Sequence, residues 1–547
     1  MKRLRLLLLF CWFCMVAFSV YGQQEKYNEA MKAYEQKDYR SGAALLDPFI
    51  KNKGESLSSM ELYNSACIYS MAGKKDAAFR LLDILATKYF MSNAQRLETD
   101  TDLAGLRGSA RWQQLIAKVD ANLKTEPARN ASTVRAALSR AKAILTADNG
   151  QLWGTALWSD DVLVLDPKNR AYGVQPFKGA VFRDSLWSQD LPERTLNQSN
   201  APQDFGGKRY AIVMTSYLLD SSATLIHELF HLAQEKQVLL NGNPVNYLDG
   251  WQGREYLRLE YEALKSGLQL ARTGAPKTSV AQALSDAVCF RKLRRALAPE
   301  ALDAETDIES SEGLANYTGF KLSDHRDKYA LAIKEINGRE SAPTYTRTFP
   351  YATGPAYGFL FDYLGINWRD GIGMHYNFGG IFEKRYLQDV VATDSVAFRA
   401  AAERHGYGRI HDEEMARKAL FERCTAWFTK TLVEAPVLRA TVVTDTYSRS
   451  FDMNGTFVLA DKGMVYTTLR GTDLKGQNFG SFQTTNTGDT DHPAGVLGSF
   501  NGRQFTFPLP VKIEGNKITG PNYELILNPG WVLQKAGNKG DLEIVRK

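Results

Sequence analysis

The spacing of hydrophobic residues divides the chain into regions of different character. Apolar residues recur at helical spacing over residues 23–125. Residues 126–435 begin with a helix around Thr133–Thr146, continue with strand-like alternation and become mainly helical after about residue 220. Residues 436–547 alternate again. We therefore expect a multidomain α+β protein. It would have N-terminal α-helical repeats, a central and mainly helical domain with a small preceding sheet, and a C-terminal all-β domain.

Short runs of alternating apolar and polar residues, bounded by Gly, Asn and Asp, predict strands in two parts of the chain. Before the helical part, these runs are Gly150–Trp158, Val162–Asp166 and Tyr210–Met214. In the last region they are Ala440–Val443, Thr456–Leu459, Met464–Leu469 and Gln504–Phe507, with turns at Asn454-Gly455 and Asn501-Gly502. The last region should form a small sandwich or barrel, and we expect it to cap the preceding domain.

Two stretches of the N-terminal region share a pattern of small and apolar residues. Ala30, Tyr34 and Gly42–Leu46 are echoed by Ala66, Tyr69 and Ala77–Leu82, about 36 residues further on. This interval is close to the tetratricopeptide period of about 34 residues, and the pattern resembles tetratricopeptide repeats. The resemblance implies stacked helical hairpins. They would either bind a protein partner or serve as a docking platform for the next domain, and we favour the platform.

The first 22 residues have the composition of an export signal. Lys2, Arg3 and Arg5 precede an apolar run from Leu6 to about Val20. This run is short for a membrane anchor. We therefore predict a cleaved signal peptide over residues 1–22 and an exported protein, periplasmic or extracellular, without a transmembrane span.

The remaining chain has little net charge and few cysteines. Without the first 22 residues, 64 Lys and Arg stand against 61 Asp and Glu. This balance provides no basic surplus for binding nucleic acid. Cys67, Cys289 and Cys424 are far apart and odd in number, so they predict neither a disulfide framework nor a cysteine zinc site.

One predicted helix, Ser221–Glu235, carries residues whose spacing points to a specific chemistry. His227 and His231 are four positions apart, and Glu228 follows the first histidine. Residues four apart project from one face of a helix, so the two imidazoles can bind one zinc ion, with Glu228 placed to take a proton from water. Because the residues from Ala223 to Ala233 are mostly apolar, the helix should be buried, where such polar groups need a shared metal.

A catalytic zinc site needs a third protein ligand, and two glutamates are candidates. Glu312 begins the segment Glu-Gly-Leu-Ala, which resembles the third-ligand segment of the thermolysin-like zinc metallopeptidases, the gluzincins. It lies 81 positions after His231, further than is usual in that family. Glu260 is closer and falls on the buried stripe of its own predicted helix. We predict Glu312 as the ligand and Glu260 as a carboxylate that orients a histidine. Glu260 as the third ligand, or paired with an arginine, is the alternative.

The resemblance implies a zincin-like domain over residues 126–435 and an exported zinc-dependent peptidase that acts on peptides or proteins. Zinc on His227, His231 and Glu312 would activate a water, and Glu228 would accept its proton as general base and return it to the leaving amine. An edge strand of the preceding sheet would hold the extended substrate.

A hydrogen-bond donor beside the metal would stabilise the negative charge that develops on the substrate carbonyl. The aromatic, Gly- and Pro-rich run Phe349–Phe359 is expected to form a loop that opens a helix and lines the cleft. The candidate donors are Tyr317, Tyr351, Tyr357 and His375.

A function of another class is also open. The chain would then be a non-catalytic, exported interaction module, with the repeats and the β domain as binding surfaces and a vestigial or structural metal site. Glu228 weighs against this alternative, because a structural metal site does not need a carboxylate beside its ligands.

Overall fold

The structure is a computed structural model that describes residues 26–53, 57–192, 195–218, 221–235, 245–369, 395–452, 455–485, 488–489, 492–537 and 539–547. The predicted signal peptide and the candidate donor His375 lie outside these residues. The chain forms two units. The first comprises residues 1–139, 163–198 and 214–219, and the second comprises residues 140–162, 199–213 and 220–547.

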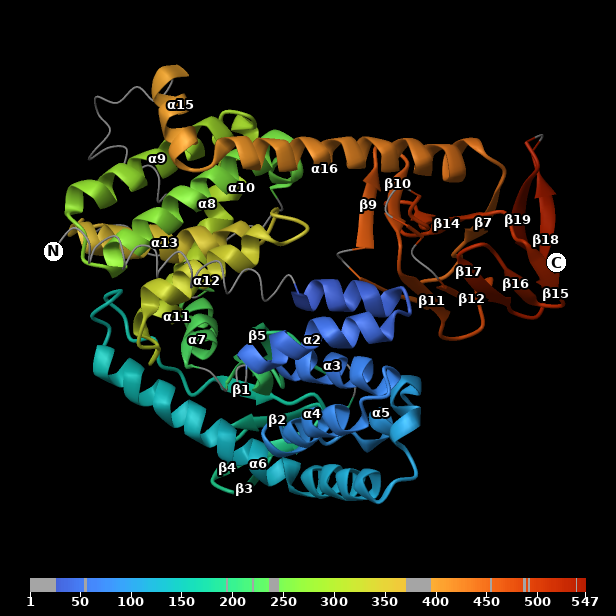
Figure 1. Cartoon of the computed structure of the whole chain (residues 1–547), viewed down its shortest axis with the longest axis horizontal. Helices are drawn as coiled ribbons and strands as arrows, with labels where there is room; N and C mark the ends of the chain where they lie inside the picture. Colours follow the sequence, from blue (N-terminus) through green and yellow to red (C-terminus); the bar gives the residue numbers. More distant parts are fainter. Residues whose placement is uncertain are drawn as a thin grey trace. The chain divides into compact units, whose positions relative to one another are not determined.

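Helices make up most of the first unit. They are residues 26–35, α2 (Tyr39–Lys53), α3 (Ser59–Met71), α4 (Lys75–Thr87), α5 (Ala94–Thr99), the short turns η2 (Thr101–Leu106) and η3 (Thr215–Tyr217), and most of α6 (Ala110–Asp148). Helix α3 begins with a reciprocal cap, in which Ser58 and Glu61 each accept a hydrogen bond from the other's backbone N–H. Helices α3 and α4 pack side by side (Figure 1), and Leu62, Ala66 and Leu82 lie in their shared core.

A small antiparallel sheet completes the first unit. Its strands are, in order of pairing, β1 (Val162–Leu165), β2 (Arg170–Gly173), β4 (Leu186–Asp190) and β3 (Val181–Arg183). In the second unit, β5 (Ala201–Phe205) pairs with β6 (Lys208–Met214). The strands predicted at Val162–Asp166 and Tyr210–Met214 are therefore confirmed.

The strand predicted at Gly150–Trp158 is wrong. These residues form turns and irregular structure. Gly150 and Gly154 have φ angles of +77° and +72°, which bend the chain where a strand would be extended. Trp153 instead packs against Phe230, with ring centroids 5.6 Å apart, and its Nε1 donates to Thr318 Oγ1 at 2.9 Å.

A group of packed helices forms the larger part of the second unit. They are α7 (Ala223–Glu235), η4 (Asn246–Asp249), α8 (Trp251–Arg272), α9 (Lys277–Arg295), η5 (Pro299–Ala301), α10 (Leu302–Ile308), the π-helical turn η6 (Glu309–Gly313), α11 (Leu314–Leu322), α12 (Lys328–Glu340), α13 (Phe349–Leu364), α15 (Ser395–Arg404), α16 (Tyr407–Phe428) and η7 (Thr429–Glu434). Helix α8 contacts α9, α12, α13 and α16 and is the centre of the group. It is amphipathic, and Leu257, Tyr261, Leu264 and Leu268 on its buried stripe are fully buried.

The C-terminal part of the second unit consists of two sheets that share one hydrophobic core. The first has the order β18 (Trp531–Ala536), β19 (Asp541–Arg546), β7 (Val437–Thr441), β14 (Gln504–Pro508), β13 (Val496–Gly498), β10 (Gly463–Tyr466) and β9 (Thr456–Leu459). The second has the order β15 (Lys512–Glu514), β16 (Lys517–Thr519), β17 (Tyr523–Leu527), β12 (Gly480–Thr484), β11 (Leu469–Asp473) and β8 (Tyr447–Phe451). Phe505 and Phe507 from the first sheet pack against Phe482 from the second.

Helix α16 joins the helical part to these sheets. It runs as one long helix from the helical group to β9 and β10 (Figure 1), and its Phe421 ring stacks on Phe457 with centroids 4.5 Å apart. The structure thus confirms a mixed fold of helices and sheets with a sheet-rich C-terminal region. None of the helices in the described residues is long and apolar enough to cross a membrane.

Candidate metal centre

Helix α7 places its polar residues on one side of a buried, mainly apolar helix. Its apolar neighbours Leu225, Ile226, Leu229 and Phe230 are at most 1% exposed. His227 and Glu228 are themselves only 6% and 4% exposed. Because water does not reach these polar side chains, they need hydrogen-bonding or metal partners within the protein.

The π-helical turn η6, between α10 and α11, brings Glu312 to these histidines. Helix α11 can approach α7 closely because Gly319 has no side chain. A Cβ atom at this position would lie 2.5 Å from the Ala223 carbonyl oxygen. Single π turns within helices are frequent at functional sites, because they change the register in which side chains project.

The three potential ligand atoms have the spacing of a zinc site. His227 Nε2 lies 3.0 Å from His231 Nε2, and Glu312 Oε2 lies 3.4 Å and 3.3 Å from these two nitrogens. Ligands that bind a tetrahedral zinc ion at about 2.0–2.1 Å are about 3.3–3.4 Å apart. Two imidazole nitrogens and a carboxylate oxygen are also among the ligand atoms that zinc prefers. The residues present therefore fit a zinc ion.

Two buried oxygen atoms at this site provide a further reason for a metal. Among the described residues, Glu312 Oε2 and Glu228 Oε2 have no hydrogen-bond partner. Glu228 Oε1 lies 4.0 Å from His227 Nε2, beside the ligands and not among them. A buried carboxylate oxygen without a partner is costly, and a metal ion with its water would satisfy both glutamates.

The pKa values at the site follow from burial and close charges. Burial raises the pKa of the Glu228 carboxyl, against the attraction of the two histidines. Burial also opposes ionisation of Glu312, but the close imidazoles of His227 and His231 outweigh it and hold the pKa of this carboxyl well below its usual range. For His231, burial is outweighed by Glu312, so its pKa is raised. Of the two carboxyls, Glu312 is therefore the one more readily ionised, as a metal ligand must be, and Glu228 the one that more readily holds a proton.

The run Phe349–Phe359 was expected to be a loop, and that expectation is wrong because these residues form the first turns of α13. Pro350 fits there, since the N–H groups of a first turn have no helical partner. Pro355 removes the N–H that would bond the Tyr351 carbonyl, and Asn316 Nδ2 donates to that oxygen at 2.6 Å instead. The helix thus tolerates an internal proline because α11 supplies the missing donor.

The glycines of α13 let it cross the η6 turn at close range. A Cβ atom at Gly354 would lie 2.3 Å from the Cα and carbonyl oxygen of Gly313, the residue after Glu312. This crossing brings Tyr351 to the site. Its ring is stacked on His227, with centroids 5.8 Å apart and an angle of 3° between the planes. Burial and the Glu312 carboxylate raise the pKa of its hydroxyl.

The other candidate donors are engaged elsewhere. The Tyr317 hydroxyl donates to Asp362 Oδ2 at 2.7 Å, and the Tyr357 hydroxyl donates to Glu260 Oε1 at 2.8 Å. His375 lies outside the described residues. Among the three tyrosines, only Tyr351 is brought to the histidines.

Glu260 belongs to a buried ion network and not to the ligand group. Its carboxylate accepts from Arg294 Nε at 3.0 Å and lies 3.5 Å from Arg291 Nη1. Arg291 also donates through both terminal nitrogens to Glu309. Glu260, Glu309 and both arginines are at most 1% exposed. The structure therefore pairs Glu260 with arginines, the alternative considered above, and among the described residues it does not bring Glu260 to a histidine.

Gln234 is a residue of the site that the sequence argument did not identify. It is 3% exposed, its Nε2 donates to the Ser310 carbonyl oxygen at 2.8 Å, and it contributes to the raised pKa of His231 after the larger effects of burial and Glu312. The one feature of the sequence that could have identified Gln234 is its position three residues after His231, a proposed ligand, on the same helix.

A second group of possible ligands, Cys67, Asp100 and Asp102, lies in the first unit. Tyr63 donates to Asp100 at 2.6 Å and Tyr34 donates to Asp102, so both carboxylates have partners. Burial raises the pKa of the Cys67 thiol, which makes it a poor metal ligand. This cluster is best explained as a structural hydrogen-bond network.

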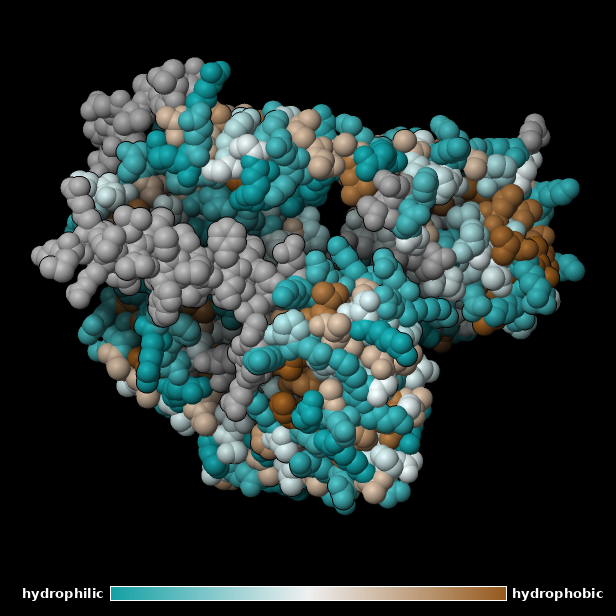
Figure 2. Space-filling view, viewed as in Figure 1, coloured by the Kyte–Doolittle hydropathy of each residue, from teal (hydrophilic) through white to brown (hydrophobic). Residues whose placement is uncertain are grey.

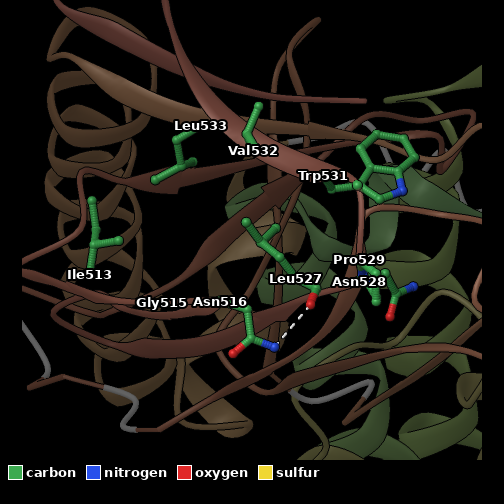
Figure 3. Close-up of a pocket in the computed structure, with 10 residues that line it drawn as sticks. Ile513, Gly515, Asn516, Leu527, Asn528, Pro529, Trp531, Val532 and Leu533 are labelled. Atoms are coloured by element: carbon green, nitrogen blue, oxygen red, sulfur yellow. Dashed lines mark hydrogen bonds between the residues drawn. The ribbon is translucent and has the colours of Figure 1, made fainter. Parts of the chain in front are cut away.

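A hollow of about 390 Å³ lies in the C-terminal region, where Figure 2 shows hydrophobic residues gathered on the surface. Trp531, Val532 and Leu533 of β18 line it together with Ile513 of β15, and Asn516 donates to the Leu527 carbonyl oxygen at 3.2 Å (Figure 3). None of the residues that line this hollow is titratable. It therefore has no group for acid–base or metal chemistry.

No family model, no curated protein and no solved structure matches this chain. The site must therefore be interpreted from its own geometry.

Proposed function

We propose that this protein is an exported zinc-dependent peptidase that hydrolyses peptide bonds with water. The observation that carries the proposal is the meeting of His227, His231 and Glu312 at separations of 3.0–3.4 Å, with Glu228 beside them. A purely structural zinc site would not need a second buried carboxylate, Glu228, beside its ligands. The proposed export rests on the signal-like composition of residues 1–22.

A zinc ion bound to these three residues would supply a Lewis acid that polarises the scissile carbonyl and makes a water more acidic. Glu228 would act as the general base. Its buried carboxyl has a raised pKa, which suits a group that must take a proton and later give it to the leaving amine. Glu312, with its lowered pKa, stays ionised and is suited to holding the metal.

Two further parts of the site would act on the substrate. The hydroxyl of Tyr351 is the best-placed donor for the developing oxyanion, because its ring is stacked on His227 and because burial and the Glu312 carboxylate keep it protonated by raising its pKa. Strand β5 contacts α7 and is the strand on which an extended peptide would pair by strand addition. The segments around His227 and Glu312 resemble those of the gluzincins, and that resemblance also implies an edge strand that holds the substrate.

Hydrolysis of a mixture of fluorogenic peptides by the zinc-loaded protein tests this proposal. We expect Glu228→Gln to keep the zinc and to lower the turnover rate about 10²–10⁴-fold, because it removes the general base. Glu262→Gln is the matched control, since Glu262 lies on α8 and pairs with Lys265 at 3.0 Å. Zinc-loaded wild-type protein that cleaves no peptide, or a fully active Glu228→Gln variant, would contradict the proposal and favour a non-catalytic interaction module.

A further inference from the structure

The π-helical turn η6 carries two carboxylates that have different partners. The turn begins at Glu309, whose carbonyl oxygen accepts from the N–H of Leu314, five residues further on. Glu312, three residues after Glu309, lies beside the histidines of α7. Glu309 is fully buried and is not one of the three ligand residues. It is therefore a buried charge on the ligand-carrying turn that the proposed mechanism does not use.

The carboxylate of Glu309 joins η6 to two other helices. Arg291 of α9 donates from Nη1 to Glu309 Oε1 at 2.8 Å and from Nη2 to Glu309 Oε2. Thr353 of α13 donates from Oγ1 to Glu309 Oε1 at 2.9 Å. All three side chains are at most 1% exposed, so water does not compete for these bonds. Because a two-pronged arginine–carboxylate pair has a fixed geometry, these contacts determine where η6 begins relative to α9 and α13.

The bond to Thr353 also connects η6 with the helix that carries Tyr351. Thr353 is two residues after Tyr351, whose ring is stacked on His227. The next residue, Gly354, lies against the Gly313 backbone, where a Cβ atom would be 2.3 Å away. The Glu309 carboxylate thus holds the turn that presents Glu312 against the helix that presents the proposed donor.

Stability alone is a weak reason for such a buried pair. Replacing a buried ion pair by apolar side chains of similar volume is often neutral or stabilising. A π turn, however, departs from the regular hydrogen-bond pattern of the helices on either side, so contacts from outside the turn must hold it. A charged pair with fixed geometry can do so where an apolar contact would let the turn shift.

We propose that Glu309 is a positioning residue of the metal site, which anchors η6 to Arg291 and Thr353 so that Glu312 meets His227 and His231. The proposal rests on the proposed function only in taking these three residues to bind a metal. The anchoring of η6 is a property of the metal-free protein as well. Disturbing it should move Glu312 without removing any ligand.

Three substitutions test the anchor, and a fourth is the matched control. Glu309→Gln keeps the size and removes the charge, and Thr353→Val keeps the shape and removes only the bond from α13. Thr353→Ser keeps the hydroxyl and should behave as wild type does. The control is Glu414→Gln on α16, because Glu414 is 2% exposed and accepts from Arg258 at 2.9 Å and Arg254 at 3.2 Å. It breaks a similar buried pair that does not touch η6.

The first readout is the metal site itself. Zinc affinity is measured by competition with a chromophoric chelator, and the visible spectrum of Co²⁺ bound in place of zinc reports the number and arrangement of its ligands. We expect Glu309→Gln to bind zinc about 10–100-fold more weakly and to change the Co²⁺ spectrum. Thr353→Val should also bind more weakly, and it decides the question if Glu309→Gln does not fold. Thr353→Ser and Glu414→Gln should match wild type. Wild-type affinity and spectra in the folded Glu309→Gln and Thr353→Val variants would overturn the proposal.

The second readout is amide hydrogen exchange over η6 in the metal-free protein, followed by mass spectrometry. We expect faster exchange at Glu309–Gly313 in Glu309→Gln and Thr353→Val, and wild-type exchange there in Glu414→Gln. Unchanged exchange in both anchor variants would overturn the proposal. Faster exchange in them, together with wild-type protein that takes up no zinc, would contradict the proposed function and leave the anchor in place.

Discussion

Glu260 and Glu312 both belong to buried helical segments, but only Glu312 reaches the histidines. The sequence could predict the two histidines and the adjacent Glu228 as a group, because their spacing within one helix fixes which face they share. It could not decide between the two glutamates. That choice depends on Arg291 and Arg294, which are 31 and 34 residues from Glu260 and meet it only in the folded chain. Gln234 was missed for the same reason, since its partner Ser310 is 76 residues away.

The ion network around Glu260 leads to a prediction about stability. Glu260→Gln should lower the free energy of unfolding by about 3–5 kcal/mol, because it leaves Arg294 buried without its full counter-charge. Urea-induced unfolding, followed by tryptophan fluorescence, measures this change. Glu422→Gln is the control, since Glu422 is 65% exposed and lies 3.9 Å from Lys418 in a surface pair. Such a pair contributes about 0–1 kcal/mol. Equal stability of both variants would contradict a stabilising role for the network.

At the scale of elements, alternation predicted some of the strands, such as Val162–Asp166 and Tyr210–Met214, and the local rules failed where glycine and proline were decisive. Gly150 and Gly154 turn an apparent strand into an irregular segment, because both adopt positive φ angles. In α13, by contrast, glycine and proline lie within a regular helix where a loop was predicted. Pro355 remains helical because Asn316 bonds the carbonyl that it leaves free, and Gly354 allows contact with η6. Rules based on local sequence do not take account of a hydrogen-bond donor on another helix, such as Asn316, or of close contact with another backbone, such as that of Gly313.

The contact between α13 and η6 leads to a prediction about packing. Gly354→Ala should destabilise the protein by about 1–3 kcal/mol, because its Cβ would lie 2.3 Å from Gly313 backbone atoms. Gly338→Ala, in α12, is the matched control, since a Cβ there meets nothing within 4 Å. It should stabilise the protein by up to about 1 kcal/mol through helix propensity. The two melting temperatures should therefore move in opposite directions, and a shift in the same direction would contradict this packing.

At the scale of the whole molecule, hydrophobic periodicity predicted a mixed fold with a sheet-rich C-terminal region, and the structure confirms this description. Periodicity did not predict how the segments group into units. Helix α6 runs without interruption through residue 125, where the pattern had suggested a boundary, and each unit is assembled from several separate segments of the chain. Grouping of this kind depends on contacts between residues that are far apart in sequence, which a local pattern does not contain.

The most direct test of the central claim is the zinc content of the purified chain, measured by elemental analysis after zinc has been added and the excess removed. We predict one zinc per chain in wild type and in Glu260→Gln, and none in His227→Ala or Glu312→Gln. Wild-type protein without zinc would contradict the metal site and the peptidase function built on it. Loss of zinc in Glu260→Gln, with zinc retained in Glu312→Gln, would contradict the ligand set that the geometry supports.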